Sequence, residues 1–243
     1  MRRRVWLGGL AVLVFISAVV FGRYYLPKIE AKERENACFT LQMDDSKIYT
    51  HGARAIRISE GAVVLEEKNG EADVLLYSDF HAPGMTVCEN YLAFFEYPAT
   101  HFYLVSIKDK KAERIETKDP VSGVKLSQKG HSLAICDVTS SLYLYTPKGK
   151  LQLTVQTDSP IADAALSGDG RQVGVLLFSA KQQNGFIAEI YRAKCGTRLT
   201  SAKFAQSGML TCRVKSRRMY LYRNDIAVGY AYSGKFHLFP ETP

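Results

Sequence analysis

The sequence predicts an all-β protein: a β-propeller of about five four-stranded blades, preceded by one N-terminal transmembrane helix. Three observations support this prediction. An apolar run occupies residues 5–22, a pattern of strands and turns recurs about every 40 residues, and turn-forming residues separate short runs rich in leucine, valine and tyrosine. With 243 residues, of which 47% are hydrophobic and 23% charged, the chain can form a sizeable core.

The first element is the segment VWLGGLAVLVFISAVVFG (5–22), which contains no charged residue. Its 18 residues would rise about 27 Å as a helix, close to the ~30 Å hydrocarbon core. The run exceeds a usual signal-peptide core and lacks an A-x-A-like cleavage site, so we expect an uncleaved anchor in the cytoplasmic membrane. A cleaved signal peptide is the alternative. Because the basic residues before the span lie closest to it, we expect residues 1–4 in the cytoplasm, with a charged stalk (23–45) and the propeller (46–239) outside.

The strongest signal is a repeat with a period of forty residues. The segment LSQKGHSLAI (126–135) is followed at that offset by LSGDGRQVGV (166–175). A period near 40 is typical of propeller blades, and Asp-Gly supplies a tight hairpin turn. Counting from residue 46 gives units near 46–80, 81–118, 119–158, 159–200 and 201–239. The positions matched at this offset are Pro120, Val124, Leu126, Ser127, Gly130, Leu133 and Ile135 with Pro160, Ala164, Leu166, Ser167, Gly170, Val173 and Val175.

A ring of blades would need a closing contact, because an open blade exposes an unpaired strand edge. Two segments are candidates for the closing strand, KIYTH (47–51) and KFHLF (235–239). The sequence does not decide between them.

Charge is distributed unevenly along the chain. Residues 28–170 carry 16 basic and 21 acidic side chains, whereas residues 171–235 carry 12 basic and 2 acidic ones. Four basic residues cluster around an expected hairpin, interleaved with tyrosines, and are our candidate binding residues: Arg213, Lys215, Arg217 and Arg218. Anionic cell-wall polymers, phospholipid headgroups or an acidic partner protein would suit them; nucleic acid would not, outside a bacterial membrane. A solvated basic hairpin is the alternative.

The sequence offers no convincing catalytic or metal site. The cysteines have no C-x-x-C spacing, so we expect no metal site of that kind; a Cys195–Cys212 bridge and buried free thiols are both open. We expect the histidines at the surface or in turns. Ser127, His131 and Asp137 have the residue types of a hydrolytic triad, but no GxSxG elbow is present, and the repeat already explains Ser127. The cysteines are Cys38, Cys88, Cys136, Cys195 and Cys212, and the histidines His51, His81, His101, His131 and His237.

At LSGDGRQVGV the chain resembles the Ser-x-Asp-Gly-[Arg/Lys] repeat of WD40-like and TolB-like propellers. Lys129 replaces the aspartate in the preceding unit, and the WD dipeptide is absent. The arrangement also resembles an uncharacterised family of bacterial membrane-anchored propeller proteins, common in Clostridia, through the segments 160–170, 175–177 and 187–196. This resemblance implies a propeller fold and a membrane location. It implies no activity.

These observations favour a single-pass membrane protein whose extracytoplasmic propeller is a non-enzymatic binding or scaffolding module, without cofactor or catalytic residues. Its partner would be a protein or an anionic envelope component. The alternative hypothesis is a small-propeller hydrolase or lyase acting on a sugar, lactone or cell-wall glycan. That activity would need histidine and carboxylate side chains facing a central channel.

Overall fold

The computed structural model describes residues 39–42, 48–51, 54–59, 62–67, 70, 72–81, 83–88, 90–180 and 184–240. They all belong to the second of two compact units, Cys38–Pro243. The predicted membrane segment lies outside the described residues, as does most of the predicted stalk. Within the part that is described, no helix is both long enough and apolar enough to span a bilayer.

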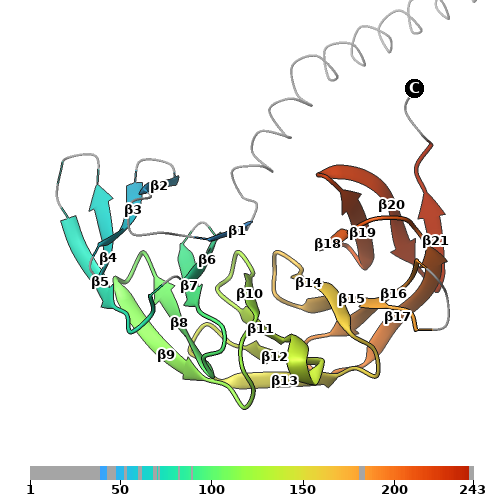
Figure 1. Ribbon diagram of the computed structural model, residues 1–243, viewed down its shortest axis with the longest axis horizontal. Coiled ribbons are helices and arrows are strands. Elements are labelled where there is room, and N and C mark those ends of the chain that lie inside the picture. Colours follow the sequence, from blue (N-terminus) through green and yellow to red (C-terminus); the bar gives the residue numbers. More distant parts are fainter. Residues whose placement is uncertain are drawn as a thin grey trace, which may run out of the picture. The chain divides into compact units, whose positions relative to one another are not determined.

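The described residues form five sheets that follow one another in chain order, and no α-helix (Figure 1). Each sheet contains four consecutive antiparallel strands, as predicted for a blade; the second has one strand more. The one short helical segment in these ranges is the 3-10 turn η2 (Asp137–Thr139). The strands of the first three sheets are β2 (Ile48–His51), β3 (Arg54–Ser59), β4 (Ala62–Glu67) and β5 (Ala72–Tyr77); β6 (Gly84–Cys88), β7 (Tyr91–Phe95), β8 (His101–Ser106) and β9 (Lys111–Glu116); and β10 (Gly123–Leu126), β11 (Ser132–Cys136), β12 (Ser141–Tyr145) and β13 (Leu151–Gln156).

The last two sheets continue the same order. They consist of β14 (Ile161–Leu166), β15 (Gln172–Phe178), β16 (Gly185–Arg192) and β17 (Arg198–Ala205), followed by β18 (Thr211–Lys215), β19 (Arg218–Arg223), β20 (Ile226–Tyr232) and β21 (Lys235–Leu238). Strands β2 to β21 fall within the units counted from the sequence, except that β17 extends five residues past the expected boundary at residue 200.

The repeated Ser-x-x-Gly segment forms the turn between the first two strands of a sheet. In the fourth sheet the Ser167 hydroxyl donates to Asp169 Oδ1 at 2.6 Å, and Asp169 Oδ1 accepts the Arg171 N–H at 3.1 Å. Gly170 completes the turn with a φ of +69°, a left-handed conformation that favours glycine. The turn at Ser127 lacks the aspartate but shares the glycine, with a φ of +79° at Gly130. In both turns the glycine N–H donates to the serine carbonyl, and the serine Oγ accepts a later backbone N–H. Local turn chemistry therefore explains why these residues recur.

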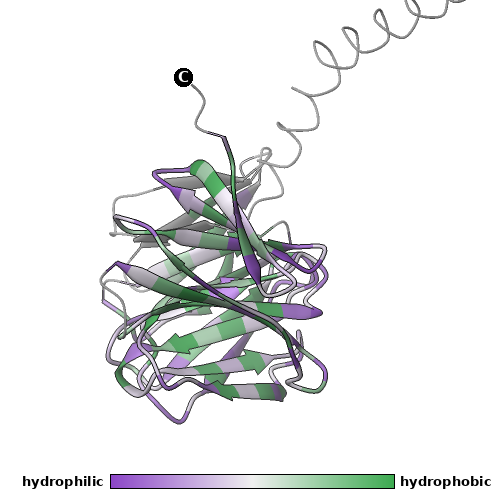
Figure 2. Cartoon of the chain, turned by 90° about the vertical axis from the view of Figure 1, so that its right-hand side faces the viewer, coloured by the Kyte–Doolittle hydropathy of each residue, from purple (hydrophilic) through white to green (hydrophobic). Residues whose placement is uncertain are grey.

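Adjacent sheets pack face to face through four apolar clusters, one between each neighbouring pair. Strand β12 shows the principle, because all five of its residues are buried: Leu142 and Leu144 face the fourth sheet, and Tyr143 and Tyr145 face the second. Hydrophobic and hydrophilic residues alternate along the outer strands (Figure 2). The period of two expected for strands is thus used to bury one or both faces of each sheet.

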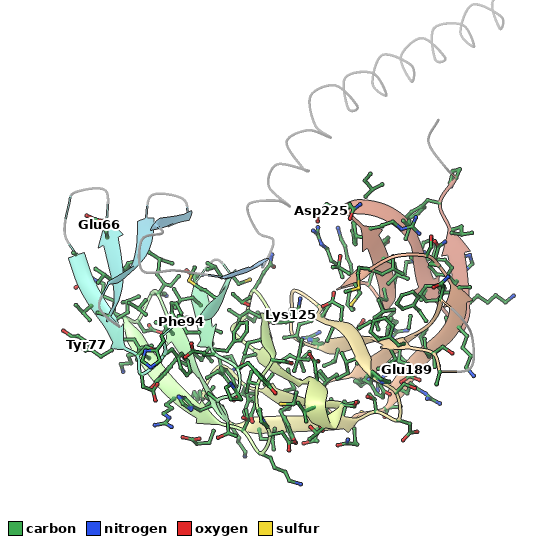
Figure 3. All side chains as sticks on the ribbon, viewed as in Figure 1. Glu66, Tyr77, Phe94, Lys125, Glu189 and Asp225 are labelled. Atoms are coloured by element: carbon green, nitrogen blue, oxygen red, sulfur yellow. The ribbon has the colours of Figure 1, made fainter. Side chains whose placement is uncertain are left out.

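Polar contacts also join the first strands of neighbouring sheets. The Thr86 hydroxyl on β6 donates to the Val124 carbonyl on β10 at 2.6 Å. Lys125 is labelled in Figure 3, and its Nζ lies 3.1 Å from Asp163 Oδ1 on β14. Asp163 Oδ2 accepts the Cys212 N–H from β18 at 2.8 Å. These contacts fix the spacing of four consecutive sheets at their first strands.

One strand departs from the predicted organisation. Residues Phe39–Gln42, which we expected in the stalk, form β1. This strand pairs antiparallel with β6 of the second sheet, with Phe39 opposite Val87, although the whole first sheet lies between β1 and β6 in the sequence. The pairing joins two segments that no local pattern connects.

The expected ring closure is not observed. Of the two candidate closing strands, residues 48–51 form β2 and pair with β3, and residues 235–238 form β21 and pair with β20. Among the described strands, neither bonds to the sheet at the other end of the series, and the five sheets are not closed. Each candidate strand instead pairs with its neighbour in the chain across a short connection, since His51 lies opposite Arg54 and Tyr232 lies opposite Lys235.

Candidate ligand-binding face

The fifth sheet, β18–β21, buries one face and exposes the other. Cys212, Val214, Met219 and Leu221 pack against the fourth sheet. The alternate residues of β18 and β19 point the opposite way, as the alternation of burial along residues 211–215 and 218–222 indicates. We call this surface the cationic face; it consists of Arg213, Lys215, Arg218, Tyr220, Tyr222, Tyr230, Tyr232, Lys235 and His237.

Tight turns set the register of this face. Ser216 and Arg217 both have positive φ, as do Asn224 and Asp225 in the next connection. Two-residue loops with two positive φ values match the twist of antiparallel strands, so they determine which residues lie opposite each other. The sequence SRR at 216–218 is therefore a turn with its second arginine already on β19.

The register aligns charged and aromatic side chains in a row across the sheet. Arg213 lies opposite Tyr220, Tyr220 opposite Tyr230, and Tyr230 opposite His237. Beside this row, Lys215 lies opposite Arg218. Such cross-strand neighbours are close enough to interact directly.

The guanidinium groups are held by the tyrosine rings. Arg213 Cζ lies 4.6 Å from the centroid of Tyr222, and Arg218 Cζ lies 5.1 Å and 5.3 Å from those of Tyr230 and Tyr232. A hydrogen bond to Tyr220 raises the pKa of Arg218 further above its ordinary range. Stacking leaves the edges of a guanidinium group accessible, in the fork geometry that binds carboxylate and phosphate. On Arg213 one such edge already faces a carboxylate, because Nη2 lies 3.8 Å from Asp225 Oδ1.

The structure places three of the four candidate binding residues on the cationic face and one elsewhere. Arg213, Lys215 and Arg218 belong to the face. Arg217 lies at the tip of the turn, and its N–H donates to Gln172 Oε1 of the fourth sheet at 3.1 Å. The sequence interpretation omitted Tyr230, Tyr232, Lys235 and His237, which could have been found from the period of two in YAYSGKFH (230–237).

Basic residues near the hairpin in sequence serve structural contacts instead. Arg198 Nη1 lies 2.8 Å from Glu189 Oε1, and Arg223 Nη2 donates to Gln206 Oε1 at 2.5 Å. Glu189, labelled in Figure 3, is only 6% exposed. It also accepts hydrogen bonds from the hydroxyls of Tyr191 and Ser201. The positive charge of the last third of the chain is thus only partly available to a ligand.

The histidines are less uniform than we expected. His81 and His237 are exposed, but His101 is buried and its Nε2 lies 3.2 Å from Asp79 Oδ1. His131 is partly buried, which lowers its pKa although nearby Asp169 opposes the shift. The expectation of surface or turn positions is therefore wrong for His101, because the apolar and aromatic contacts of β8 enclose it. Among the described residues, no three His, Cys, Asp or Glu side chains are grouped to hold a metal ion.

Of the three residues considered as a hydrolytic triad, Ser127 and His131 contact each other within one turn, and Asp137 bonds elsewhere. Ser127 Oγ accepts the His131 N–H at 3.0 Å and lies 3.5 Å from His131 Nδ1. The Asp137 N–H donates to Ser122 Oγ at 3.3 Å. Ser127 thus closes its turn, as Ser167 does forty residues later.

The open question of a Cys195–Cys212 bridge is answered by both thiols being free, Cys195 exposed and Cys212 buried. Cys136 is also a free, buried thiol. Cys88 is disulfide-bonded. Cys38 lies outside the described residues.

A family model matches residues 32–185, nearly two thirds of the chain, and is described as a family of unknown function (DUF5711). The chain belongs to the DUF5711 family. No curated protein matches it.

Several solved structures share the fold. The Kluyveromyces lactis Hsv2 structure gives a TM-score of 0.53 at 9% identity over 82% of this chain and 73% of that chain. Kuenenia stuttgartiensis hydrazine synthase gives 0.50 at 13% identity over 70% of this chain, which spans only 52% of the hydrazine synthase chain. These neighbours are propeller-like, so the all-β, propeller-like fold is supported; identities this low show the fold alone.

Proposed function

We propose that this DUF5711 protein is a single-pass membrane protein whose extracytoplasmic, propeller-like domain is a non-enzymatic binding module for an anionic envelope component or an acidic partner protein. The observation that carries the binding proposal is the cationic face. It is the outward face of a terminal sheet, and it presents stacked guanidinium groups where other sheet faces present apolar side chains.

The proposed occupant follows from this chemistry. An apolar partner sheet would remove the charged groups of Arg213, Lys215 and Arg218 from water, at a large desolvation cost. A second copy docking through the same face would bring like charges together, which is unfavourable. A partner that carries carboxylate or phosphate groups would accept hydrogen bonds from the guanidinium groups and balance their charge, while leaving them partly hydrated.

The proposed location rests on the apolar segment 5–22 and on the cysteines. Three basic residues precede that segment closely, which favours a cytoplasmic N-terminus. The disulfide at Cys88 is typical of an oxidising compartment and supports an extracytoplasmic domain.

A retention assay tests the binding proposal. The purified full-length protein, in detergent or nanodiscs, is applied to purified cell wall, to vesicles containing anionic lipid and to an immobilised fraction of solubilised envelope proteins. Replacing Arg213, Lys215 and Arg218 by glutamate should lower retention at least about tenfold, because six units of charge change on one face. The matched control replaces three exposed basic residues outside that face, Arg171, Lys194 and Lys203, by glutamate.

Equal losses in the two triple variants would attribute retention to net charge and contradict a role for the cationic face. Retention on wall alone, on vesicles alone, or only on a solubilised protein fraction would identify the partner class. No retention of the wild type on any of the three would refute the binding proposal.

The exposed thiol of Cys195 reports the location independently. In intact cells a membrane-impermeant maleimide should label the protein, and Cys195→Ser should abolish the label. Labelling that appears only after lysis would place the domain in the cytoplasm and refute the proposed topology.

A further inference from the structure

A cleft separate from the cationic face lies at one end of the second sheet. It is about 470 Å³ in volume and is bounded by the connection that follows β5 and the connection between β7 and β8. Its lining includes two carboxylates, Asp79 and Glu96, and two aromatic rings, Phe80 and Tyr97. None of the described residues that line it is a lysine or an arginine.

The buried histidine of this cleft has polar contacts on both sides of its ring. Arg114 Nη2 lies 3.3 Å from His101 Nδ1. On the other side, His101 Nε2 lies 3.2 Å from Asp79 Oδ1. These two contacts hold the ring beside the carboxylate of Asp79.

Asp79 is held in its charged form at the mouth of the cleft. Tyr103 Oη also donates to Asp79 Oδ1, at 3.0 Å. Burial alone would raise the pKa of Asp79, but the hydrogen bonds from His101 and Tyr103 lower it below its ordinary value. The side chain is 56% exposed, so an approaching ligand can reach it. Glu96 is oriented by the His81 N–H, 3.0 Å from its Oε2.

Part of this arrangement recurs forty residues later, and part of it is particular to the cleft. Tyr143 donates to Asp119 at 2.5 Å, which repeats the bond between Tyr103 and Asp79. At the same offset, however, the fully buried Val121 and Cys136 occupy the positions of His81 and Glu96. The cleft therefore forms where polar residues replace core positions of the repeat, so its polar lining is not a requirement of the fold.

We infer that this cleft binds a small organic ammonium compound. Its two carboxylates supply the charge, and the ring of Tyr97, which is 58% exposed, supplies a face for a cation–π contact. Phe80 stacks on His101 at 4.9 Å and makes the adjoining wall apolar. Metal ions prefer several oxygen ligands, whereas this lining combines two carboxylates with aromatic and apolar walls, as a substituted ammonium group requires.

Titration calorimetry on the purified full-length protein tests this inference. The probes are choline, cadaverine and 3,3-dimethyl-1-butanol, the last having the shape of choline without its charge. We expect choline or cadaverine to bind and the alcohol not to bind. Preference between the two cations distinguishes a quaternary from a primary ammonium ligand. Calcium chloride serves as the metal probe.

Three variants report on the cleft: Asp79→Asn, Glu96→Gln and Tyr97→Ala. Each should weaken binding of the cation about tenfold or more, whereas Asp158→Asn, an exposed carboxylate outside the cleft, should have no effect. Asparagine retains an acceptor for His101 and Tyr103, and thermal denaturation verifies that the variants fold. Binding of neither cation, equal binding of choline and the alcohol, binding of calcium alone, or cation binding unchanged by these three substitutions would overturn the inference.

Retention on wall or vesicles through the cationic face is independent of this result. A protein that fails to bind ammonium compounds but is retained through Arg213, Lys215 and Arg218 would refute only the cleft proposal. The reverse outcome would refute only the cationic-face proposal.

Discussion

The imidazole of His131 lies directly over Gly170 of the next sheet, so that a Cβ atom at position 170 would approach His131 Nδ1 to 2.3 Å. The same relationship occurs forty residues earlier, where the ring of Tyr91 would lie 2.5 Å from a Cβ atom at position 130. The side chain that follows one turn thus covers the glycine of the next turn. The repeated glycine serves contact between sheets as well as the turn itself.

Replacing Gly170 by alanine should therefore be more destabilising than its positive φ alone requires. The left-handed conformation costs a non-glycine residue about 1–2 kcal/mol, and overpacking against His131 about 1–3 kcal/mol more. Urea denaturation measures the sum. Gly234→Ala is the matched control, because its φ is +79° but the nearest atom to its Cβ would be 3.8 Å away. Adding His131→Ala should recover the packing cost; no recovery, or equal effects of the two glycine substitutions, would contradict the proposed contact.

The second prediction concerns how much the ion pair between Arg198 and the buried carboxylate of Glu189 contributes to stability. Replacing Arg198 by methionine leaves Glu189 with only the Tyr191 and Ser201 hydroxyls, so the free energy of unfolding should fall by about 2–3 kcal/mol. Arg171→Met is the control, because Arg171 and its partner Asp169 are 80% and 44% exposed and lie 3.7 Å apart. That substitution should cost less than about 1 kcal/mol. Equal costs measured by chemical denaturation would show that Glu189 is not held by Arg198.

Thiol reactivity should differ sharply among the cysteines. Cys195 is exposed, and a hydrogen bond with Thr197 lowers its pKa below the ordinary thiol value, so the native protein should be alkylated there fastest. Burial and, secondarily, Asp119 and Asp137 raise the pKa of Cys136 to about 12, and Cys212 is buried, so both should react only after unfolding. Mass spectrometry of alkylated peptides measures the rates. Cys88 should be labelled only after reduction, and a non-reducing digest that links it to Cys136, Cys195 or Cys212 would contradict the structure.

The turn at Asp169 should make stability depend on acid pH. Burial would raise the pKa of Asp169, but the Ser167 hydroxyl and the Arg171 N–H outweigh this and lower it. A carboxyl whose pKa is lower in the folded state contributes stability above the pKa of the unfolded chain, about 4, and loses that contribution as the pH falls further. The urea midpoint of the wild type should therefore fall more steeply below about pH 4 than that of Asp169→Asn. Parallel curves for the two proteins would rule out this contribution.

Much of the fold could be predicted because its determinants are local. The turn at Ser167, Asp169 and Gly170 is specified by adjacent residues, and leucine and valine spacing locates the strands on either side. The partner of β1 could not be predicted in this way, because Phe39 and Val87 are separated by the entire first sheet. Ring closure was predicted from the general need to protect sheet edges, a rule that does not consider which side chains cover the terminal face.

The candidate site shows the same limit. Charge density alone identified Arg213, Lys215 and Arg218, but it also included Arg217. Arg217 lies in the two-residue turn, whereas the adjacent Arg218 is already paired with Lys215, and charge density does not distinguish these two positions. Tyr230 and His237 join the site only through strand register across two further turns. The cleft at Asp79 also depends on the buried ring of His101, which Arg114 contacts from the neighbouring strand. Sequence spacing does not reveal this contact between β8 and β9.

The pairing of β1 with β6 has a mechanical consequence. Tension on the chain ahead of Phe39 would reach the second sheet through the β1–β6 hydrogen bonds before it reached the first sheet, because β1 is bonded outside the segment it precedes. The strands β2 to β5 lie between β1 and β6 in the sequence, so a force transmitted through the β1–β6 pairing does not pass through the first sheet. It is shielded from pulling until β1 detaches, and only then would the load pass to β2.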